Sequence, residues 1–196
     1  MASSLSRAFD KLLEWTIVLS FSQIGYILRH NMWDTAHLDV DMSGKTCIVT
    51  GANSGLGFAT SVHLAELGAS VIMVARDPAR GQSAVREVVD RTGNPSVRLE
   101  IVDLSSLEAV RGFADRFLEQ EDRLDVLINN AGVLLPERQL SADRFELSFA
   151  TNVLGPFLLT NLLMPLLARS SPARIIFVSS GGMYTQKLDV DDLQSE

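Results

Sequence analysis

The segment TGANSGLG, Thr50–Gly57, decides the fold, because it joins a short buried strand to the helix that follows it. Before it stands KTCIVT, an apolar and β-branched run typical of buried parallel strands. Gly51 permits a tight turn, while Gly55 and Gly57 remove side chains that would block a pyrophosphate or separate helix from strand. The helix N-terminus offers free N–H groups and a partial positive charge. Because no Gly-Lys-Ser/Thr ending follows, the loop predicts a dinucleotide phosphate site and disfavours a P-loop.

Outward from this loop, runs typical of buried strands alternate with helical runs from Gly44 onward. The predicted strands span residues 45–50, 70–75, 97–103, 124–129 and 174–179. Helices between parallel strands imply right-handed crossovers. The sequence therefore predicts an α/β fold with an open, doubly wound parallel sheet.

The helix ends also carry local signals. Asp77 and Pro78 predict the N-cap and first position of the helix that Gly93 ends. Ser105 and Glu108 have capping-box spacing for the next helix. A long helix is expected over residues 141–168, after the fourth strand.

The composition allows one domain with a substantial core and excludes an electrostatic attraction to nucleic acid. The 196 residues are 46% hydrophobic and carry a formal net charge of −7, without a basic stripe. The single cysteine, Cys47, lies in an apolar run and is interpreted as a buried, inert thiol. Because no intrachain disulfide can form, a reducing compartment is favoured, and we expect a cytoplasmic protein. No metal site is expected.

Residues 1–43 differ from the rest, and we interpret them as a helical extension before a domain of residues 44–196. The stretch Trp15–Leu28 carries no charge and is shorter than the roughly 20 residues that a spanning helix needs. Its apolar residues recur at helical spacing, and the charged residues before it disfavour a secretory signal. Two interpretations stay open: a helix packed against the domain or a partner, and a peripheral membrane contact through residues 12–28.

Further motifs follow the loop in a consistent order. Asp103 ends the third predicted strand, NNAG (Asn129–Gly132) ends the fourth, Asn152 lies within TNVLG, and Ser180 follows the fifth. With the Gly-x-x-x-Gly-x-Gly spacing of the loop, these motifs resemble the short-chain dehydrogenase/reductase family over residues 44–196. The resemblance implies a Rossmann-like fold and an oxidoreductase that passes hydride between a nicotinamide cofactor and an alcohol or carbonyl carbon.

The resemblance also implies a set of cofactor-binding residues. Asp103 is similar to an adenine-contacting aspartate of the family, although a helix cap would equally explain it. The segment NNAG is similar to one that shapes the nicotinamide side of the pocket, although its asparagines would also suit an ordinary turn. The expected contacts come from Gly51, Asn53, Ser54, Gly55, Leu56, Gly57, Arg76, Asp103, Leu104, Asn130, Ala131 and Gly132.

The choice of cofactor depends on the end of the second strand. An acidic residue there usually binds the ribose hydroxyls of NAD. This chain has Ala75 followed by Arg76, whose guanidinium can donate two hydrogen bonds to a phosphate. We therefore expect NADP(H) in preference to NAD. The alternative is that Arg76 only forms a surface ion pair with Asp77 or with an acid on a helix.

The resemblance implies catalytic roles for Ser180, which would hold the substrate oxygen, and Asn152, which would organise a proton relay. Asn152 could instead satisfy backbone groups freed at a kink before Gly155-Pro156. A family tyrosine exchanges the proton, and a lysine four residues later lowers its pKa. Tyr184 and Lys187 are three apart, and no tyrosine in this sequence has a lysine four residues after it.

We therefore expect this chain to be the cofactor-binding half of such an enzyme, ending before the catalytic helix and the last strands. The chain itself would be inactive, and its fifth strand would form an exposed edge. A homo-oligomer is doubtful without the missing helix. The substrate would be a small alcohol or carbonyl compound, and the apolar N-terminal segment favours one of lipid-like character. The alternative function is a catalytically silent dinucleotide-binding or interaction module.

Overall fold

The computed structural model describes residues 24, 26, 27, 30, 38, 40–184 and 187–195, with Tyr184 described by its backbone alone. Within these residues, five parallel strands form one sheet in the order β3-β2-β1-β4-β5. The strands are β1 Thr46–Thr50, β2 Ser70–Ala75, β3 Val97–Ile101, β4 Val126–Asn129 and β5 Arg174–Phe177. The predicted Rossmann-like α/β fold is confirmed, and four of the strands are one or two residues shorter than expected.

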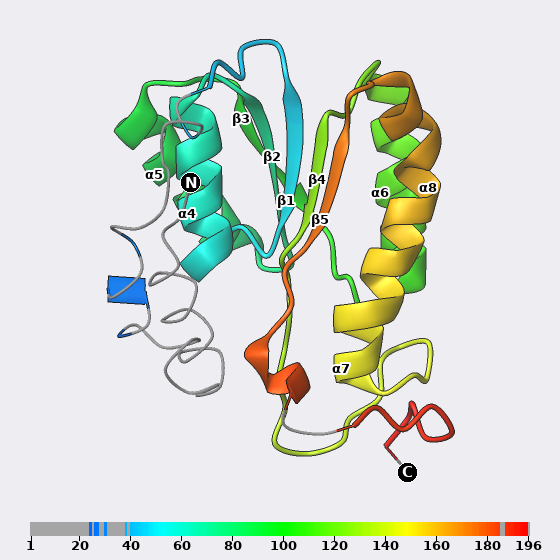
Figure 1. Ribbon diagram of the computed structural model, residues 1–196. Coiled ribbons are helices and arrows are strands. Elements are labelled where there is room, and N and C mark those ends of the chain that lie inside the picture. The colour runs from blue at the N-terminus through cyan, green and yellow to red at the C-terminus, as the bar shows by residue number, and fades with distance from the viewer. Residues whose placement is uncertain are drawn as a thin grey trace, which may run out of the picture. The chain divides into compact units, whose positions relative to one another are not determined.

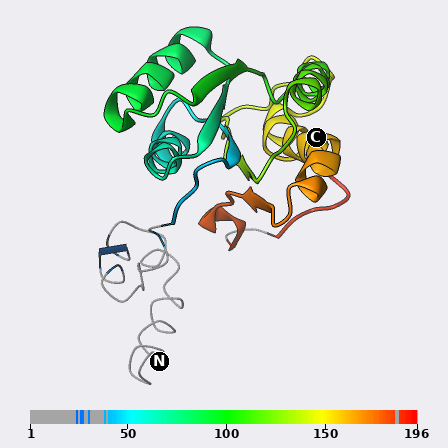
Figure 2. The same cartoon turned by 90° about the horizontal axis from the view of Figure 1, so that it is seen from above.

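Two helices cover each face of the sheet. Helices α4, Gly55–Glu66, and α5, Pro78–Thr92, lie on one face. Helices α6, Leu107–Gln120, and α8, Gly155–Arg169, lie on the other, as the views in Figures 1 and 2 agree. The chain order of these elements alternates strand and helix up to β4. The arrangement is that of a doubly wound sheet.

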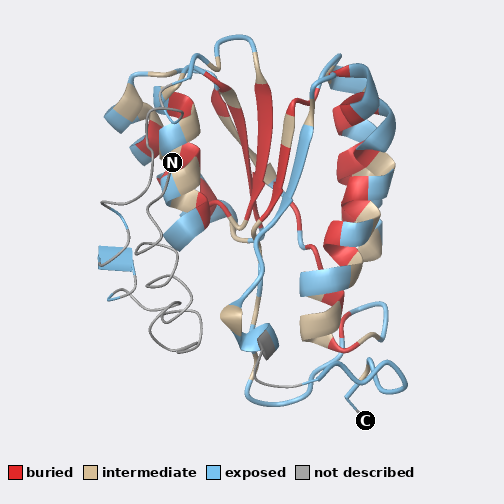
Figure 3. Cartoon of the chain, viewed as in Figure 1, coloured by how far each residue is buried: buried red, intermediate tan, exposed pale blue. Residues whose placement is uncertain are grey.

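The core consists of two apolar clusters, one on each face. Ile48 of β1 belongs to the cluster with Phe113 and Leu163, beneath α6 and α8. Its neighbours Cys47 and Val49 belong to the cluster beneath α4 and α5, because successive residues of a strand point to opposite faces. Figure 3 shows the central strands buried. Cys47 is a free, buried cysteine, and burial followed by the nearby Asp125 charge raises the pKa of its thiol to about 12. The inert-thiol interpretation agrees with this environment.

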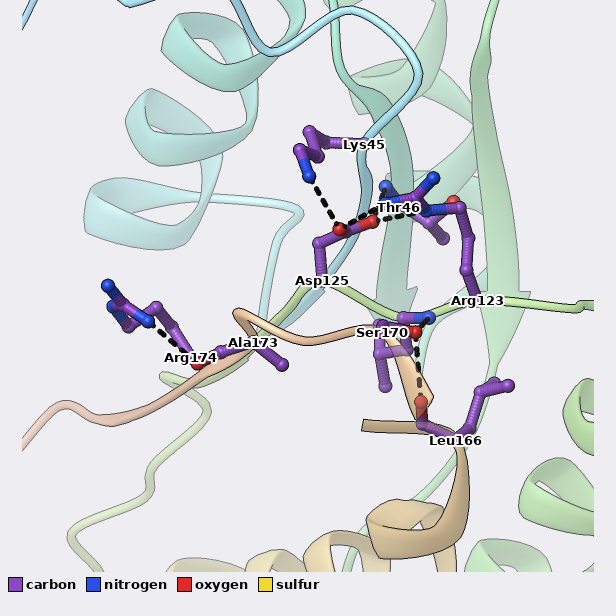
Figure 4. Close-up of polar contacts among 9 residues, drawn as sticks. Lys45, Thr46, Arg123, Asp125, Leu166, Ser170, Ala173 and Arg174 are labelled. Carbon is purple, nitrogen blue, oxygen red and sulfur yellow. Dashed lines mark hydrogen bonds and ion pairs between the residues drawn. The ribbon is translucent and has the colours of Figure 1, made fainter. Parts of the chain in front are cut away.

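A buried carboxylate joins the two central strands at their amino ends. The side chain of Asp125 is only 3% exposed and accepts hydrogen bonds from Lys45 Nζ at 3.1 Å and Thr46 N–H at 2.9 Å. Arg123 donates through Nε at 2.8 Å and through a terminal nitrogen at 2.6 Å (Figure 4). Since Thr46 begins β1 and Asp125 directly precedes β4, this network fixes the strands at the end opposite the glycine-rich loop.

The local helix signals are largely confirmed. Asp77 is the N-cap of α5, its side chain accepting from Arg80 N–H, and Pro78 is in the first turn. Gly93 ends the helix in the left-handed conformation, with φ of 68°. The capping prediction for α6 was wrong by one residue. Ser106, not Ser105, is the N-cap and accepts from Ala109 N–H, because the Ser105 hydroxyl donates to Asp103 instead.

The long helix begins later than predicted. Residues 141–146 form a turn in which Ser141 N–H bonds to the Phe145 carbonyl, with Arg144 at a positive φ of 64°. The Glu146 carboxylate then accepts from the first N–H groups of the helix and starts it. The helical run consists of α7, Leu147–Phe149, the π-helical segment η2, Ala150–Leu154, and α8. Asn152 lies inside this π-helical segment.

The two edges of the sheet differ in character. At the β3 edge, Arg98 pairs with Glu121 at 2.9 Å, and Glu100 lies 3.7 Å from Arg116. At the β5 edge, Ile176 and Phe177 are 44% and 56% exposed, as the pale colouring of this strand in Figure 3 shows. The β5 edge is thus exposed and apolar, whereas charged pairs protect the β3 edge. Charge on an edge strand discourages pairing with another chain.

The chain divides into two compact units, which are considered separately. Asp41–Val178 with Asp189–Glu196 contain the sheet and its helices, and Ser179–Leu188 belong with the described residues before Asp41. Most of the helix predicted over 12–28 lies outside the described residues, so the membrane contact stays a prediction. Of the described helices, the run Leu147–Arg169 is long and apolar enough to cross a membrane by length and composition. Its buried Leu159, Leu163 and Leu166 pack in the domain core instead.

Candidate dinucleotide-binding site

A cavity of about 310 Å³ lies at the carboxyl ends of the first four strands. Its walls come from the glycine-rich loop, the end of β2, the segment after β3 and the segment after β4. They comprise Gly51, Asn53, Ser54, Val74, Ala75, Arg76, Asp77, Arg80, Val102, Asp103, Leu104, Asn130, Ala131, Gly132, Val133 and Thr151. Because the sheet order reverses between β1 and β4, the cavity occupies the switch point where doubly wound sheets bind ligands.

The glycine-rich loop needs glycine for two separate reasons. Gly51 has a φ of 63°, and a Cβ there would lie 2.8 Å from the Ala131 Cα. Gly57 is buried in the first turn of α4, and its Cβ would lie 2.5 Å from the Gly51 carbonyl oxygen and 2.5 Å from Asn130 Nδ2. All three distances are shorter than real Cβ contacts, so a side chain would push the loop away from the β4 segment. The absence of side chains keeps the floor of the cavity open to a ligand.

Among the described residues, the N-terminus of α4 has no capping side chain. Ser54 is the N-cap residue with extended backbone, but its side chain makes no capping hydrogen bond. The first turn also contains no acidic residue. By contrast, Asp77 caps α5 and Ser106 caps α6. The N–H groups of the first turn of α4 are therefore available to an anion such as a pyrophosphate.

Hydrogen bonds hold the β1 and β4 ends together beneath the cavity. The hydroxyl of the fully buried Thr50 accepts from the N–H groups of Asn130, at 2.9 Å, and Ala131, at 3.0 Å. The side-chain amide of Asn130 donates back to the Thr50 carbonyl at 2.8 Å. Asn130 thus lines the cavity but uses its amide nitrogen to fix the two loops in place. Its role is to position backbone that would contact a cofactor.

The part of the cavity wall that follows β2 and β3 has charged residues of both signs. The Asp103 carboxylate accepts from the Ser105 N–H at 2.9 Å and from the Ser105 hydroxyl at 2.7 Å. The helix-cap alternative for Asp103 is therefore wrong, because Ser106 is the N-cap of α6 and Asp103 bonds to the segment before it, while remaining in the cavity wall. Within the described part of the chain, the guanidinium of neither Arg76 nor Arg80 has a hydrogen-bond or ion-pair partner. The surface ion pair considered for Arg76 is therefore not formed, and its guanidinium remains available to a ligand.

Asn152 adjoins the cavity through a contact with Val133. Its Oδ1 accepts from the Val133 N–H and its Nδ2 donates to the Val133 carbonyl, each at 2.8 Å. The side chain therefore bonds to the loop after β4 and not to backbone groups freed at a kink in its own helix, which the kink interpretation had expected. Pro156 has no N–H to donate to the Asn152 carbonyl, which fits the π-helical geometry around it.

The structure brings nine of the twelve predicted cofactor residues into one cavity wall, while Gly55, Leu56 and Gly57 form the first turn of α4 beside it. Ser180 belongs to the other unit, where its hydroxyl accepts from Gly182 N–H at 3.1 Å. Its catalytic role with Asn152 stays a prediction. The side chain of Tyr184 lies outside the described residues.

Sequence reasoning missed Arg80, Asp77, Val133 and Thr151 as cavity residues. One signal could have indicated Arg80. The Asp77-Pro78 start places this arginine in the first turn of a helix that begins just beyond the second strand. Val133 and Thr151 carried no comparable signal, because the loop after β4 and the π-helical segment η2 reach the cavity only through tertiary packing.

A glycine-rich loop, an open helix N-terminus and a cavity at the switch point define a dinucleotide-binding α/β protein. The pattern of the family described as "short chain dehydrogenase" matches residues 45–187. The chain is 46% identical to dehydrogenase/reductase SDR family member 12 of Bos taurus, over 90% of this chain and 55% of the relative. It is 44% identical to retinol dehydrogenase 13 of Mus musculus, over 76% of this chain and 45% of that protein.

A solved structure extends the comparison. A putative short chain dehydrogenase from Shigella flexneri, complexed with NADP, superposes with a TM-score of 0.63 at 28% identity, covering 72% of this chain and 61% of the other. The chain belongs to the short chain dehydrogenase family of oxidoreductases. It spans about half the length of the curated relatives described above.

Proposed function

We propose that this chain is the cofactor-binding half of an NADP(H)-dependent oxidoreductase that interconverts an alcohol and a carbonyl compound. The observation that carries the cofactor choice is the guanidinium of Arg76, which directly follows β2, lies in the wall of the cavity and has no partner among the described residues. NADP(H) differs from NAD(H) by a phosphate on the adenosine ribose. A free guanidinium at this position offers that phosphate two parallel hydrogen bonds.

The nearby acidic side chain supports this choice. Asp77, which would be the first candidate to bind ribose hydroxyls, accepts from the Arg80 N–H at 2.9 Å as the N-cap of α5. The Shigella flexneri relative, whose fold this chain shares, is complexed with NADP. The pyrophosphate would lie on the open N-terminus of α4, above Gly51.

Roles in the reaction follow from the family resemblance. The bound cofactor would supply or accept hydride. Ser180 would hold the substrate oxygen, and Asn152 would position the loop at Val133 beside the reacting groups. The proton donor is expected to be a tyrosine with a lysine four residues later, and this sequence contains no such pair. We therefore expect nucleotide binding by this chain to be weak and carbonyl reduction to be absent.

A substitution at Arg76 tests the cofactor choice. Arg76→Ala should weaken NADPH binding about tenfold while changing NADH binding less than about twofold, because only NADPH has the additional phosphate. Titration of each nucleotide by calorimetry or fluorescence gives the ratio of dissociation constants. An unchanged ratio would contradict the proposed preference for NADP(H).

The second candidate function is a silent dinucleotide-binding or interaction module, favoured by the missing tyrosine–lysine pair. Turnover of aldehydes and ketones with NADPH separates the two. Robust carbonyl reduction that is lost in Tyr184→Phe would show that the chain is a complete catalyst. No turnover together with NADPH binding would support the cofactor-binding half or the silent module.

The substrate class and location also belong to this proposal. A lipid-like alcohol or carbonyl compound fits the apolar N-terminal segment, and one relative is named retinol dehydrogenase 13. The protein would be cytoplasmic, with peripheral membrane contact through residues 12–28. Flotation with anionic liposomes, comparing the chain with a version lacking residues 1–40, tests this contact. Equal flotation of both would remove it.

A further inference from the structure

We propose that two copies of this chain pair through the β5 edges of their sheets and form a closed dimer around a twofold axis. This inference goes beyond the proposed function and does not depend on the cofactor. β5 is the last strand of the sheet, and every residue from Arg174 to Val178 is exposed (Figure 3). The doubt about a homo-oligomer concerned a helix that this sequence lacks, whereas the β5 edge is a different surface.

The backbone of β5 has a regular set of hydrogen-bonding groups along this edge. The N–H groups of Arg174 and Val178 donate to the β4 segment at 2.8 Å and 2.9 Å. Because successive peptide groups of a strand point to opposite edges, the N–H and carbonyl groups of Ile175 and Phe177 point away from β4. Among the described residues, no strand follows β5 in the sheet. These outward groups are therefore available to a strand of a second chain.

A twofold axis through Ile176 uses all of these outward groups. Antiparallel pairing then places Ile175 of one copy opposite Phe177 of the other, and each such pair exchanges two hydrogen bonds. The two Ile176 side chains meet at the axis. This register also suits the side chains, because apolar residues lie opposite apolar residues and Arg174 lies opposite Val178 instead of a second arginine.

Helix α8 has an exposed and mostly apolar flank on the same side. Thr160 bonds to Asn129 of β4 and marks the face of α8 toward the sheet. Leu159 and Leu166 are buried roughly a quarter turn from it, toward α6. Roughly a quarter turn to the other side lies a stripe of four exposed residues, Phe157, Asn161, Met164 and Ala168. Because α6 precedes β4 and α8 connects β4 to β5, this stripe is on the side of the β5 edge.

The middle of this stripe is level with Ile176. Asn129 pairs with Phe177 in the sheet and bonds to Thr160 at 3.1 Å. Since α8 runs opposite to the strands, one residue back along β5, about 3.3 Å, corresponds to roughly two residues onward along α8. Ile176 is therefore level with about residue 162, at the centre of the stripe.

The two α8 helices would meet across the same axis. Because each α8 connects β4 to β5 and packs over them, the two helices would be roughly two strand spacings apart, about 10 Å, which is near the distance of packed helices. Phe157 of one helix would lie opposite Ala168 of the other, a large side chain against a small one. Asn161 and Met164 would lie closer to the axis. The strand pairing and the helix contact thus agree on one axis.

The other edge of the sheet disfavours open-ended pairing. At β3, Arg98 pairs with Glu121 and Glu100 lies near Arg116, so charged side chains protect that edge. A contact from β5 to β3 of the next copy would repeat without closing, whereas β5 paired with β5 uses the same surface in both copies and closes. A second copy therefore fits the β5 edge as a dimer.

The test measures the mass of the 196-residue chain in solution by light scattering or sedimentation over a concentration series. The wild type should reach a plateau at twice the monomer mass of 21.4 kDa. Ile176→Lys brings two charges together at the axis and should give a monomer where the wild type is dimeric. Ile101→Lys, at the β3 edge, is the matched control and should stay dimeric, because Ile101 is 43% exposed and Ile176 is 44% exposed.

A cysteine at the axis tests the register. Facing residues of a non-hydrogen-bonded antiparallel pair have Cα atoms about 4.5 Å apart, which is within disulfide range. Mild oxidation should therefore convert most of Ile176→Cys to a disulfide-linked dimer, and Ile101→Cys should remain largely unlinked. The native Cys47 is fully buried and should not contribute.

The outcomes separate this inference from its alternatives. A wild type that is monomeric at every concentration up to about 0.1 mM overturns it, and so does a mass that rises without a plateau. Equal loss of the dimer in Ile176→Lys and Ile101→Lys would place the contact elsewhere. Thermal unfolding checks that Ile176→Lys is folded; if it is not, the cross-linking of Ile176→Cys decides. NADPH binding by Ile176→Lys should match the wild type, because the described cavity wall includes no residue of β5.

Discussion

Asn152 and Val133 are joined by a reciprocal pair of hydrogen bonds, each 2.8 Å long, between one side-chain amide and one backbone unit. The pair connects the π-helical segment η2 to the loop that follows β4. Val133 itself lies in the cavity wall. The contact therefore holds one part of the cavity wall, the loop at Val133, against the π-helical segment η2.

Removing this contact should loosen the loop. Asn152→Ala is expected to lower the free energy of unfolding by about 1–2 kcal/mol, since two exposed hydrogen bonds are lost. Urea denaturation followed by circular dichroism measures the change. The control is Asn161→Ala, whose side chain bonds only to the Phe157 carbonyl within the same exposed helix and should cost less than about 0.5 kcal/mol. Equal losses in both variants would contradict a special role for the Val133 contact.

Gly57 should not tolerate a side chain. Gly57→Ala places a Cβ 2.5 Å from the Gly51 carbonyl oxygen, so we expect a loss of about 1–3 kcal/mol in unfolding free energy and weaker nucleotide binding. Gly112→Ala on α6 is the contrasting variant, because a Cβ there meets nothing nearer than Arg116 at 3.5 Å. It should raise stability by about 0.5–1 kcal/mol through higher helix propensity. Thermal denaturation would refute the steric argument if both changes had the same sign.

Asp125 should make stability depend on acidic pH. Burial raises the pKa of this carboxyl group, but hydrogen bonds from Arg123, Thr46 and Lys45 outweigh burial and lower the pKa from 3.8 to about 2. A folded-state pKa below the unfolded value means that the contribution, about 2 kcal/mol, is complete above about pH 4 and is lost as the pH falls toward 2.

Unfolding free energies measured from pH 6 to pH 2 test this dependence on Asp125. In Asp125→Asn, the part of the loss that occurs between about pH 4 and pH 2 should be smaller. Asp115→Asn, which changes an exposed carboxylate on α6, should retain the wild-type slope. Identical slopes in all three proteins would show that other carboxylates determine the acid sensitivity.

Cys47 should be unreactive in the folded protein. Burial raises the pKa of its thiol to about 12, so almost no thiolate exists at pH 8. A maleimide or disulfide reagent is expected to modify the chain only after denaturant is added. Rapid stoichiometric modification under native conditions would mean that β1 opens readily or that the thiol is accessible.

Asp77→Asn should favour the phosphorylated cofactor. Asparagine is also a good N-cap, so α5 should stay intact while one negative charge leaves the cavity. NADPH binding is expected to tighten by about twofold to fivefold, the scale of a partly screened charge pair, and NADH binding to change less. Asp90→Asn, exposed near the end of the same helix, is the control. Weaker NADPH binding in Asp77→Asn would show that the carboxylate helps the cofactor rather than opposing it.

Much of the fold could be predicted because its signals are local. The strand limits at Ser70–Ala75 and the helix limits at Asp77, Pro78 and Gly93 follow from side-chain period, capping and backbone conformation, which neighbouring residues determine. The late start of the long helix could not be predicted in the same way. Residues 141–146 have helix-compatible composition, and only the turn at Arg144 and the cap at Glu146 exclude them from the helix.

The candidate site also has features that local sequence signals predict and features that they do not. The sequence by itself determined that a glycine-rich loop would stand between β1 and α4, and it predicted cofactor-binding residues at the carboxyl ends of the strands, where the cavity lies. The positive φ at Gly51 favours glycine, and the short apolar, β-branched run before it predicts the strand β1. Both signals depend only on neighbouring residues.

Only the tertiary structure decided which side chains stay free to meet a ligand. It assigned the Asp77 carboxylate to a helix cap, left the guanidinium groups of Arg76 and Arg80 without protein partners within the described residues, and joined Asn152 to Val133. The Asp125 network connects residues 80 positions apart in the chain. Such contacts depend on the packing of elements against one another, and the pattern of neighbouring residues does not contain that information.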